Sequence, residues 1–379
     1  MLAAARSLAG AGFRVGAVAA HPHAATHWSR ACWRRYVAPD PRLDAGAFVE
    51  ALARIFESAA FSMLIPGSDA ALLAISSHRV DLPPWALRGL PPHPAVDASL
   101  DKRRLAEAAQ TAGLPQPPSV ACATLEQALD AARAIGFPVL LKPRSTVFAA
   151  PDGSLRQRSS RIVRDERELR TLASEYGFPC LVQGRLAGEV FSLGGVMAET
   201  GIAPAVMARY ERTWPPAAGN AAYAATVEPP RPLVSRAGRL LEAVGWRGLF
   251  ELELIRRSRD SFVPIDLNPR PYGSLALASA AGAPLAVEWC RFLTGERPSR
   301  VAARPGYRYR WEEAELRHLW WSLRRGRLRA ALAALRPRRR TVHAYFHWRD
   351  PAPLAAWALG GGGRLIASRR GRSAISPRV

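Results

Sequence analysis

Long apolar segments are missing from this sequence, because Arg, Pro or Gly interrupts each hydrophobic run before it reaches the length that crosses a bilayer. No transmembrane helix is therefore predicted. The beginning of the chain also lacks the basic start and continuous apolar stretch of a secretory signal peptide, since Arg6 and Arg14 interrupt it. We expect a protein of the cytoplasm.

Cysteine is scarce and scattered along the chain. No CxxC spacing occurs, so neither a zinc site nor a disulfide framework is indicated. We expect buried thiols in a reducing compartment. The four cysteines are Cys32, Cys122, Cys180 and Cys290.

Acidic residues are also few relative to basic ones. The chain has 53 Lys and Arg against 31 Asp and Glu, a formal net charge of +22. Such a charge attracts anions, whether nucleotides, nucleic acid or an acidic membrane surface. Because most of the excess is arginine in a chain rich in Ala, Pro and Gly, charge alone does not choose among these partners.

The chain is long enough for several domains. At 379 residues with 49% hydrophobic content, it can form two or three domains with cores of their own. Residues 1–95 alternate helix-like segments such as "DAGAFVEALARIFESA" with strand-like segments such as "RVGAVA" and "FSMLIPGSD". This rhythm predicts a parallel sheet covered by helices. The strand expected before the first helix is missing from the sequence.

A polar pattern occurs in the run "PIDLNPRPYGS", residues 264–274. Asp266, Asn268 and Arg270 occupy every second position of an otherwise apolar segment. In a β-strand these side chains project from one face, while Ile265 and Leu267 point to the core. The run therefore predicts a strand with a polar site on one face.

The preceding run "FELELI" alternates in the same way and is joined to this strand by "RSRDS", which is typical of a hairpin turn. A turn centred on residues 259–260 places Glu253 directly opposite Asp266, and Glu251 opposite Asn268. Carboxylates placed across two strands repel each other and destabilise a sheet. Such a pair indicates a bound cation.

Oxygen ligands alone favour magnesium or manganese, and magnesium commonly combines a few carboxylates with substrate phosphates. A solvated hairpin face with scattered charges is the alternative, and alternation by itself does not decide between the two.

Four segments in order, "FPVLLKP", "LVQGRLAGE", "FELELI" and "PIDLNPRPYGSLALASAAG", resemble ATP-grasp proteins, most of all the ATP-dependent carboxylate-amine ligase-like branch. A fifth, "ARYERTWPPAAG", is similar to the family's basic segment. The resemblance implies an α/β protein with an ATP-grasp fold, in which two α+β subdomains grip ATP behind a Rossmann-like parallel α/β domain. The implied boundaries are 1–95 for the preceding domain, 96–185 and 186–300 for the two subdomains, and 301–379 for a basic, helical C-terminal extension.

The resemblance also implies a metal and phosphate site for ATP with Mg²⁺ or Mn²⁺. Its metal ligands are Glu253, Asp266 and Asn268. Glu251 competes with Glu253, because a register error of one pair would exchange them. The implied phosphate lysines are Lys102 and Lys142; without the resemblance, Lys142 would be interpreted as a lysine at the end of a strand and Lys102 as an exposed helix lysine.

The remaining implied roles concern the nucleotide and the substrate. Backbone groups near Leu181 and Val182 would hold the adenine, Gln183 would begin the polar part of this hinge, and Glu189 would bind the ribose. Three arginines would contact phosphate, acyl group or substrate carboxylate, for which a planar guanidinium is suited. They are Arg209, Arg212 and Arg270.

One departure from the family pattern concerns the loop at residues 144–161. Many ATP-grasp proteins have a glycine-rich loop there that closes over the phosphates, whereas this loop contains one glycine, Gly153.

The implied activity is an ATP-dependent ligase that joins a small-molecule carboxylate to an amine through an acyl phosphate. Two alternatives stay open: a kinase-like or carbamoyl-phosphate-type reaction that stops at phosphoryl transfer, and a nucleotide- or anion-binding protein without ligase activity.

The basic segment at residues 311–340 suggests a further alternative. Its apolar positions resemble one helical stripe, which is typical of a helix at a membrane surface but also of a helix packed on its own domain. A nucleic-acid groove is not indicated, since aromatic residues do not alternate with basic ones there. The positions are Leu316, Leu319, Trp320, Leu323 and Leu328.

Overall fold

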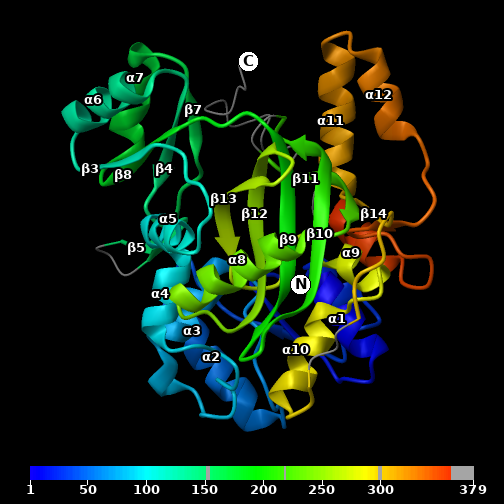
Figure 1. Ribbon diagram of the computed structural model, residues 1–379. Coiled ribbons are helices and arrows are strands. Elements are labelled where there is room, and N and C mark those ends of the chain that lie inside the picture. The colour runs from blue at the N-terminus through cyan, green and yellow to red at the C-terminus, as the bar shows by residue number, and fades with distance from the viewer. Residues whose placement is uncertain (151–153, 217–218, 298–300, 360–379) are drawn as a thin grey trace.

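The computed structural model describes residues 1–150, 154–216, 219–297 and 301–359, and the predicted loop glycine Gly153 lies outside them. In this part of the chain no helix is long and apolar enough to cross a membrane. The structure is a mixed α/β fold built around a seven-stranded sheet, with a smaller four-stranded sheet beside it and helices packed against both (Figure 1).

The N-terminal unit contains more helix than strand. Its two strands, β1 and β2, pair in parallel, and no other strand joins them among the described residues. The segment at residues 61–68, predicted as a strand, is irregular, so a Rossmann-like sheet is not confirmed. The elements are α1 (Leu2–Gly10), β1 (Gly16–Ala19), η1 (Ala25–Trp28), β2 (Arg34–Val37), α2 (Ala45–Ser58), α3 (Asp69–Ser77), η2 (Arg79–Asp81) and α4 (His93–Leu100).

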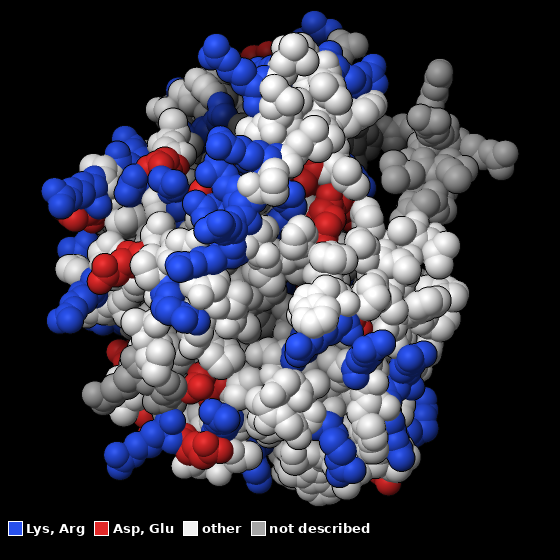
Figure 2. All heavy atoms as spheres, turned by 90° about the vertical axis from the view of Figure 1, so that its right-hand side faces the viewer, with Lys and Arg blue, Asp and Glu red and all other residues white. Residues whose placement is uncertain are grey.

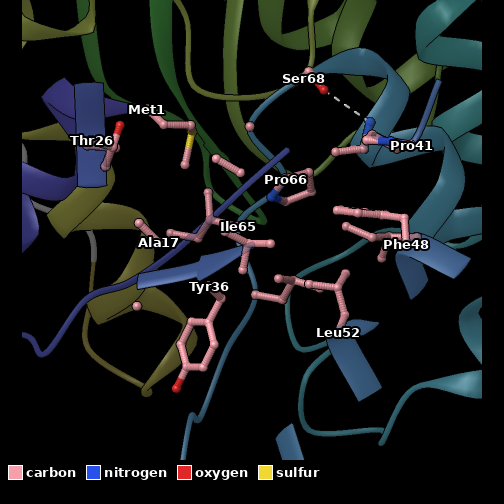
Figure 3. A pocket seen from close by; sticks show the side chains of 18 of the residues that line it. Met1, Ala17, Thr26, Tyr36, Pro41, Phe48, Leu52, Ile65, Pro66 and Ser68 are labelled. Carbon is pink, nitrogen blue, oxygen red and sulfur yellow. Dashed lines mark hydrogen bonds between the residues drawn. The ribbon is translucent and has the colours of Figure 1, made fainter. Parts of the chain in front are cut away.

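A cavity of about 620 Å³ lies beside β1 in this unit. Figure 3 shows its wall of apolar side chains, with Phe48 and Leu52 from α2 on one side and Ile65 and Pro66 from the irregular segment behind. Asp69 and Arg270 belong to its lining as well. The cavity therefore reaches from the core of the N-terminal unit to the polar strand that the sequence singled out.

The second unit is a four-stranded antiparallel sheet in the order β3-β8-β4-β7. Helices α6 and α7 cover it with an apolar core that includes Leu129, Leu141 and Val182. A small hairpin of β5 and β6 lies apart from the sheet. The elements are α5 (Lys102–Thr111), β3 (Ser119–Cys122), α6 (Leu125–Ile135), β4 (Val139–Pro143), β5 (Val147–Ala149), β6 (Leu155–Gln157), β7 (Arg161–Val163), α7 (Glu166–Tyr176) and β8 (Cys180–Gly184).

Helix α5 joins the second unit to the third. Asp101 caps its N-terminus, since its carboxylate accepts from the backbone N–H groups of Arg103 and Arg104. Its apolar side, including Leu105 and Ala109, packs into the core that α8 shares with the seven-stranded sheet. This packing fixes Lys102, the first residue of α5, above the polar hairpin.

The third unit is the seven-stranded sheet, in the order β13-β12-β9-β10-β11-β14-β15. One core lies between the sheet and α8 with α5, and another lies between the sheet and α9, α10 and α1. The elements are β9 (Glu189–Ala198), β10 (Gly201–Trp214), β11 (Asn220–Val227), α8 (Arg231–Ala243), β12 (Gly248–Ser258), β13 (Ser261–Asn268), α9 (Leu275–Ala280), α10 (Leu285–Leu293), β14 (Arg308–Arg310), α11 (Glu312–Arg324), α12 (Leu328–Leu335) and β15 (Thr341–His343).

The segment after residue 300 is not only helical. Strand β14 pairs antiparallel with β11, and β15 pairs in parallel with β14, so both extend the central sheet. The prediction of a separate helical extension is therefore not confirmed. Each of these strands has three residues, too few for a period-two pattern to stand out in the sequence.

A buried carboxylate ties the C-terminal region to the N-terminal unit. Asp350 accepts hydrogen bonds from Arg6 Nε at 2.9 Å, from Ser29 Oγ at 2.6 Å and from the Arg30 backbone N–H at 3.0 Å. Its side chain is 9% exposed. A polar group that is buried with its partners leaves those partners unsatisfied when it is removed.

We expect Asp350→Ala to lower the free energy of unfolding by about 2 kcal/mol, because three donors lose their acceptor. The measurement is chemical denaturation followed by circular dichroism. The matched control is Asp130→Ala, whose carboxylate is 77% exposed and pairs only along its own helix; it should change stability by less than about 0.5 kcal/mol. Equal effects of the two substitutions would contradict the structural role of Asp350.

Candidate active site

The predicted acidic hairpin is present with the predicted register. Strands β12 and β13 pair antiparallel, with Glu253 opposite Asp266 and Glu251 opposite Asn268. The pairing shifts by one residue between Glu253 and Leu254 and shifts back before the turn. Because the two shifts cancel, the simple count from the turn gives the right partners.

The two glutamates of β12 differ in their surroundings. Glu251 is 4% exposed and accepts hydrogen bonds from Asn268 Nδ2 at 3.0 Å, from the Tyr210 hydroxyl at 3.3 Å and, at 3.5 Å, from Ser274 Oγ. Glu253 is half-buried and accepts a bond from the same Tyr210 hydroxyl at 3.3 Å. Glu251 is thus held by protein donors, whereas Glu253 retains acceptor capacity for another group.

Both glutamates carry raised pKa values. Burial is the main cause in each case, because a carboxylate loses its hydration in the protein interior. For Glu253, the neighbouring charges of Glu251 and Asp266 raise the pKa further. The hairpin therefore gathers more negative charge than its protein surroundings neutralise.

Two lysines from the second unit reach this hairpin. Lys102 Nζ lies 2.5 Å from Asp266 Oδ1. Burial raises the pKa of Asp266, but the attraction of Lys102 outweighs it, and the pKa lies below its ordinary value. Lys142, on β4, donates to the Ile265 carbonyl at 3.4 Å. Burial, together with repulsion from Lys102, lowers the pKa of Lys142 to about 8.

Arg270 follows β13 and is held from two sides. Its Nε and Nη2 atoms lie 2.6 and 3.2 Å from the two carboxylate oxygens of Asp69, and Nη2 also donates to Asn268 Oδ1 at 3.1 Å. Asp69 is the first residue of α3, which Ser68 caps. The N-terminal unit therefore fixes the plane of this guanidinium.

Two of these neighbours were not predicted. Tyr210 lies in the segment "ARYERTW", of which only the arginines were predicted to bind a ligand. Asp69 follows the irregular segment that was predicted as a strand. The alternation of β10 offered a signal for Tyr210, because it places a polar group on the same side of the sheet as the hairpin acids.

The residues predicted as the adenine hinge lie in the four-stranded sheet. Leu181 and Val182 lie in β8, which pairs with β3 on one edge and with β4 on the other. Strand pairing engages the backbone there on both edges, so these two residues offer no free backbone to a ligand. Gln183 pairs in the same way. The first residues beyond the strand are 185–188, between Gly184 and β9.

Three other predicted residues, Glu189, Arg209 and Arg212, lie outside the group of side chains that contact the acids of the hairpin. Glu189, at the start of β9, forms an ion pair with Arg256 and lies 3.9 Å from Arg209. Arg212 binds both carboxylate oxygens of Glu315, at 2.7 and 2.6 Å, and is 14% exposed. Arg212 therefore has a structural partner that the sequence did not reveal.

The donor set fits a divalent cation in part. Glu253 and Asp266 supply carboxylate oxygens, while the amide oxygen of Asn268 is engaged by Arg270. Within the described residues, no group of three or more His, Cys, Asp and Glu side chains is arranged to hold a metal ion by itself. A cation at this hairpin would therefore need further ligands from a bound phosphate group.

Comparisons with known proteins show what the chain is similar to. The family model "Carbamoyl-phosphate synthase L chain, ATP binding domain" matches residues 101–175, which include both lysines. The carbamoyl phosphate synthase large chain of Vibrio cholerae is 28% identical over 214 residues, covering 53% of this chain and 19% of the relative. The chain thus spans well under half the length of the curated relatives it matches.

Solved structures resemble most of the chain. N5-carboxyaminoimidazole ribonucleotide synthetase from Thermus thermophilus has a TM-score of 0.60 and 20% identity, over 81% of this chain and 78% of that one. Biotin carboxylase from Campylobacter jejuni has a TM-score of 0.60 and 16% identity, over 81% and 71%. An L-amino acid ligase from Bacillus licheniformis has a TM-score of 0.55 and 14% identity, over 73% and 68%. At these identities the likeness shows the fold.

The raised pKa values predict a pH dependence of stability. Without divalent cations, the raised pKa values make the folded state bind more protons than the unfolded state. For Glu253 this holds between pH 4.5, the ordinary pKa of glutamate, and about pH 8, its raised pKa. Stability therefore falls as pH rises through this window, by roughly 1 kcal/mol per pH unit and titrating group. Denaturant titrations in the presence of a chelator measure it.

The variant Glu253→Gln should flatten this slope, because its side chain has no proton to lose. Glu228→Gln, at an exposed glutamate of the loop before α8, is the control and should leave the slope unchanged. A slope in Glu253→Gln as steep as that of the parent would mean that Glu253 is ionised in the folded state throughout the window, because Glu251 by itself accounts for only part of the slope.

Proposed function

We propose that this chain, a member of the ATP-grasp superfamily, is an ATP-dependent ligase that joins a small-molecule carboxylate to an amine. One observation carries the proposal. Lys102 on α5 and Lys142 on β4 reach the acidic hairpin from the second unit, beside Arg270, which follows β13. Phosphoryl transfer depends mainly on positioning and on neutralising charge, and this convergence supplies both.

The nucleotide's triphosphate would lie between the four-stranded sheet and the hairpin. Lys102 and Lys142 would then donate to phosphate oxygens, and Lys102 would exchange its present partner Asp266 for them. When bound, Mg²⁺ or Mn²⁺ would neutralise the triphosphate and take Glu253 and Asp266 as protein ligands, with Asn268 beside them. The release of Lys102 from Asp266 would make that carboxylate available.

Arg270 would orient the substrate carboxylate. Its guanidinium is held by Asp69, Asn268 and the Pro271 carbonyl, which leaves one N–H of Nη1 to donate in a fixed plane. A carboxylate oxygen would attack the γ-phosphorus of ATP, and ADP would leave. The amine nitrogen would then attack the acyl carbon of the resulting acyl phosphate, release phosphate and lose a proton.

The substrates would enter from the side of the N-terminal unit. Asp69 and Arg270 lie where the cavity beside β1 meets the hairpin. A ligase of this kind needs no protein nucleophile, because ATP activates the carboxylate. Glu189 and the backbone of residues 185–188 would hold the ribose and the adenine, and Arg209 would contact substrate or phosphate from the neighbouring strand.

We expect magnesium ATP to raise the melting temperature by about 5 °C when ATP is present at roughly 100 times its Kd. Asp266→Ala should lose the magnesium-dependent part of this shift, because it removes one of the two carboxylate ligands. The measurement is differential scanning fluorimetry with ATP, with and without magnesium. Asp260→Ala, in the exposed turn of the same hairpin, is the matched control and should shift like the parent.

A second experiment addresses the reaction. In a screen of carboxylates with and without amines, an active pair should form ADP, and ¹⁸O placed in the carboxylate should appear in the released phosphate. Arg270→Lys should lower kcat/KM for that pair by about tenfold or more, since a bidentate charged contact is lost. Arg259→Lys, in the exposed turn, should keep full activity.

Transfer of ¹⁸O to phosphate would support the acyl phosphate. Accumulation of the acyl phosphate without amide would support the kinase-like alternative instead. Binding of magnesium ATP with no ADP formed for any pair would favour a nucleotide-binding protein without ligase activity.

A further inference from the structure

Helices α11 and α12 form a hairpin at one edge of the central sheet. Figure 1 shows α11 extending away from the body of the protein beyond β14, with α12 returning beside it. The residues between them, Arg325 to Arg327, form the tip of this hairpin. Arg212 on β10 binds Glu315 near the start of α11, whereas all residues from 323 to 329 at the far end of the hairpin are exposed.

The hairpin has small residues inside and most of its large apolar residues outside. Ala314, Ser322, Ala331 and Ala334 are buried, and Leu319 and Trp321 are half-buried. Six large apolar side chains are exposed by 52 to 66%. They are Leu316, Trp320 and Leu323 on α11, and Leu328, Leu332 and Leu335 on α12.

The exposed apolar residues have the same spacing on both helices. Each set has the spacing i, i+4, i+7, which places three side chains on one side of a helix. A helix of a globular protein normally turns such a stripe toward its own core. Here the stripe on each helix is exposed, so the core that the described residues form does not account for it.

Charge is distributed unevenly along the hairpin. The three acids of α11 lie in its first turn and are engaged there: Glu312 by the backbone N–H groups of Tyr345 and Phe346, Glu313 by Arg317, and Glu315 by Arg212. The tip and the end of α12 are basic. The exposed arginines are Arg324, Arg325, Arg327, Arg329, Arg336, Arg338, Arg339 and Arg340.

Arginine and tryptophan lie together at the tip. The Arg324 guanidinium is 4.7 Å from the ring centre of Trp320, and those of Arg325 and Arg327 are 5.0 and 4.8 Å from that of Trp321. Figure 2 shows an uncharged surface at the top of this side of the molecule with Lys and Arg on its borders. Apolar side chains flanked by long basic ones are the arrangement of a helix that lies in a membrane interface.

We propose that the α11–α12 hairpin docks on an anionic lipid surface. The leucines and Trp320 would enter the boundary between headgroups and acyl chains, and the arginines would bind the headgroup phosphates. This proposal is independent of the proposed ligase activity.

Other occupants match the hairpin less well. A nucleic acid pairs with the arginines but gives six exposed apolar side chains nothing to contact. A second copy of this chain brings the same arginines to the interface, where they repel. A lipid surface with anionic headgroups satisfies both features of the hairpin.

The test is sedimentation of the full chain with vesicles of phosphatidylcholine alone and of phosphatidylcholine mixed with phosphatidylglycerol. We expect binding to the mixed vesicles that weakens as salt is raised. The triple variant Trp320→Ser, Leu328→Ser, Leu332→Ser should bind at least tenfold more weakly, and Arg325→Ala about fivefold more weakly.

The control is Leu43→Ser with Val80→Ser, which removes two exposed apolar side chains of the N-terminal unit and should leave binding unchanged. All substituted positions are exposed, so the melting temperature of each variant should match the parent. Magnesium ATP should also shift the melting temperature of the triple variant as it does that of the parent.

Three results would overturn the proposal. The first is no binding to the mixed vesicles, or equal loss in the control. The second is a dimer in the parent that the triple variant dissociates, which would identify a second copy as the partner. The third is tight binding of an oligonucleotide without binding to vesicles, where Arg325→Ala weakens the oligonucleotide binding and the triple variant leaves it unchanged.

Discussion

The structure depends on how a cluster of buried like charges is balanced. Three carboxylates, Glu251, Glu253 and Asp266, lie on adjacent strands of one hairpin, where burial alone makes each of them unfavourable. Two cations balance them: Lys102 from the start of α5, and Arg270, which follows β13 and is fixed by Asp69 of α3. The electrostatic requirement of one hairpin therefore joins all three units, because the second unit supplies Lys102 and the N-terminal unit supplies the carboxylate that holds Arg270.

This arrangement explains why the units meet where they do. Helix α5 lies across the boundary with its apolar side in the core of the central sheet and its first residue above the acids. Arg144 forms an ion pair with Asp101 at 2.6 Å, and so links the start of α5 to the end of β4. A ligand that binds the lysines changes the contact between the sheets, since the same side chains hold the sheets together.

Alternation in the sequence predicted the local part of this site, and the family resemblance named Lys102 and Lys142, which the structure brings to the hairpin. Alternation and a short turn determine which residues face each other in a hairpin, so the pairing of Glu253 with Asp266 followed from counting. The partners of Arg212 and Arg270 did not follow, because Glu315 and Asp69 lie about a hundred and two hundred residues away along the chain. No local rule connects such pairs. For the predicted adenine hinge, the sequence identified β8 but not that strands pair with both of its edges.

The packing of α1 has a consequence while the chain is being synthesised. Ala4 and Leu8 of this helix belong to the same core as Leu275, Ala278 and Leu285 of α9 and α10. The ribosome produces the N-terminus first, at about 5 to 20 residues per second, so the apolar side of α1 emerges roughly 15 to 60 seconds before the helices that bury it. During that interval the nascent chain exposes the apolar side of α1, which is the kind of surface that chaperones bind.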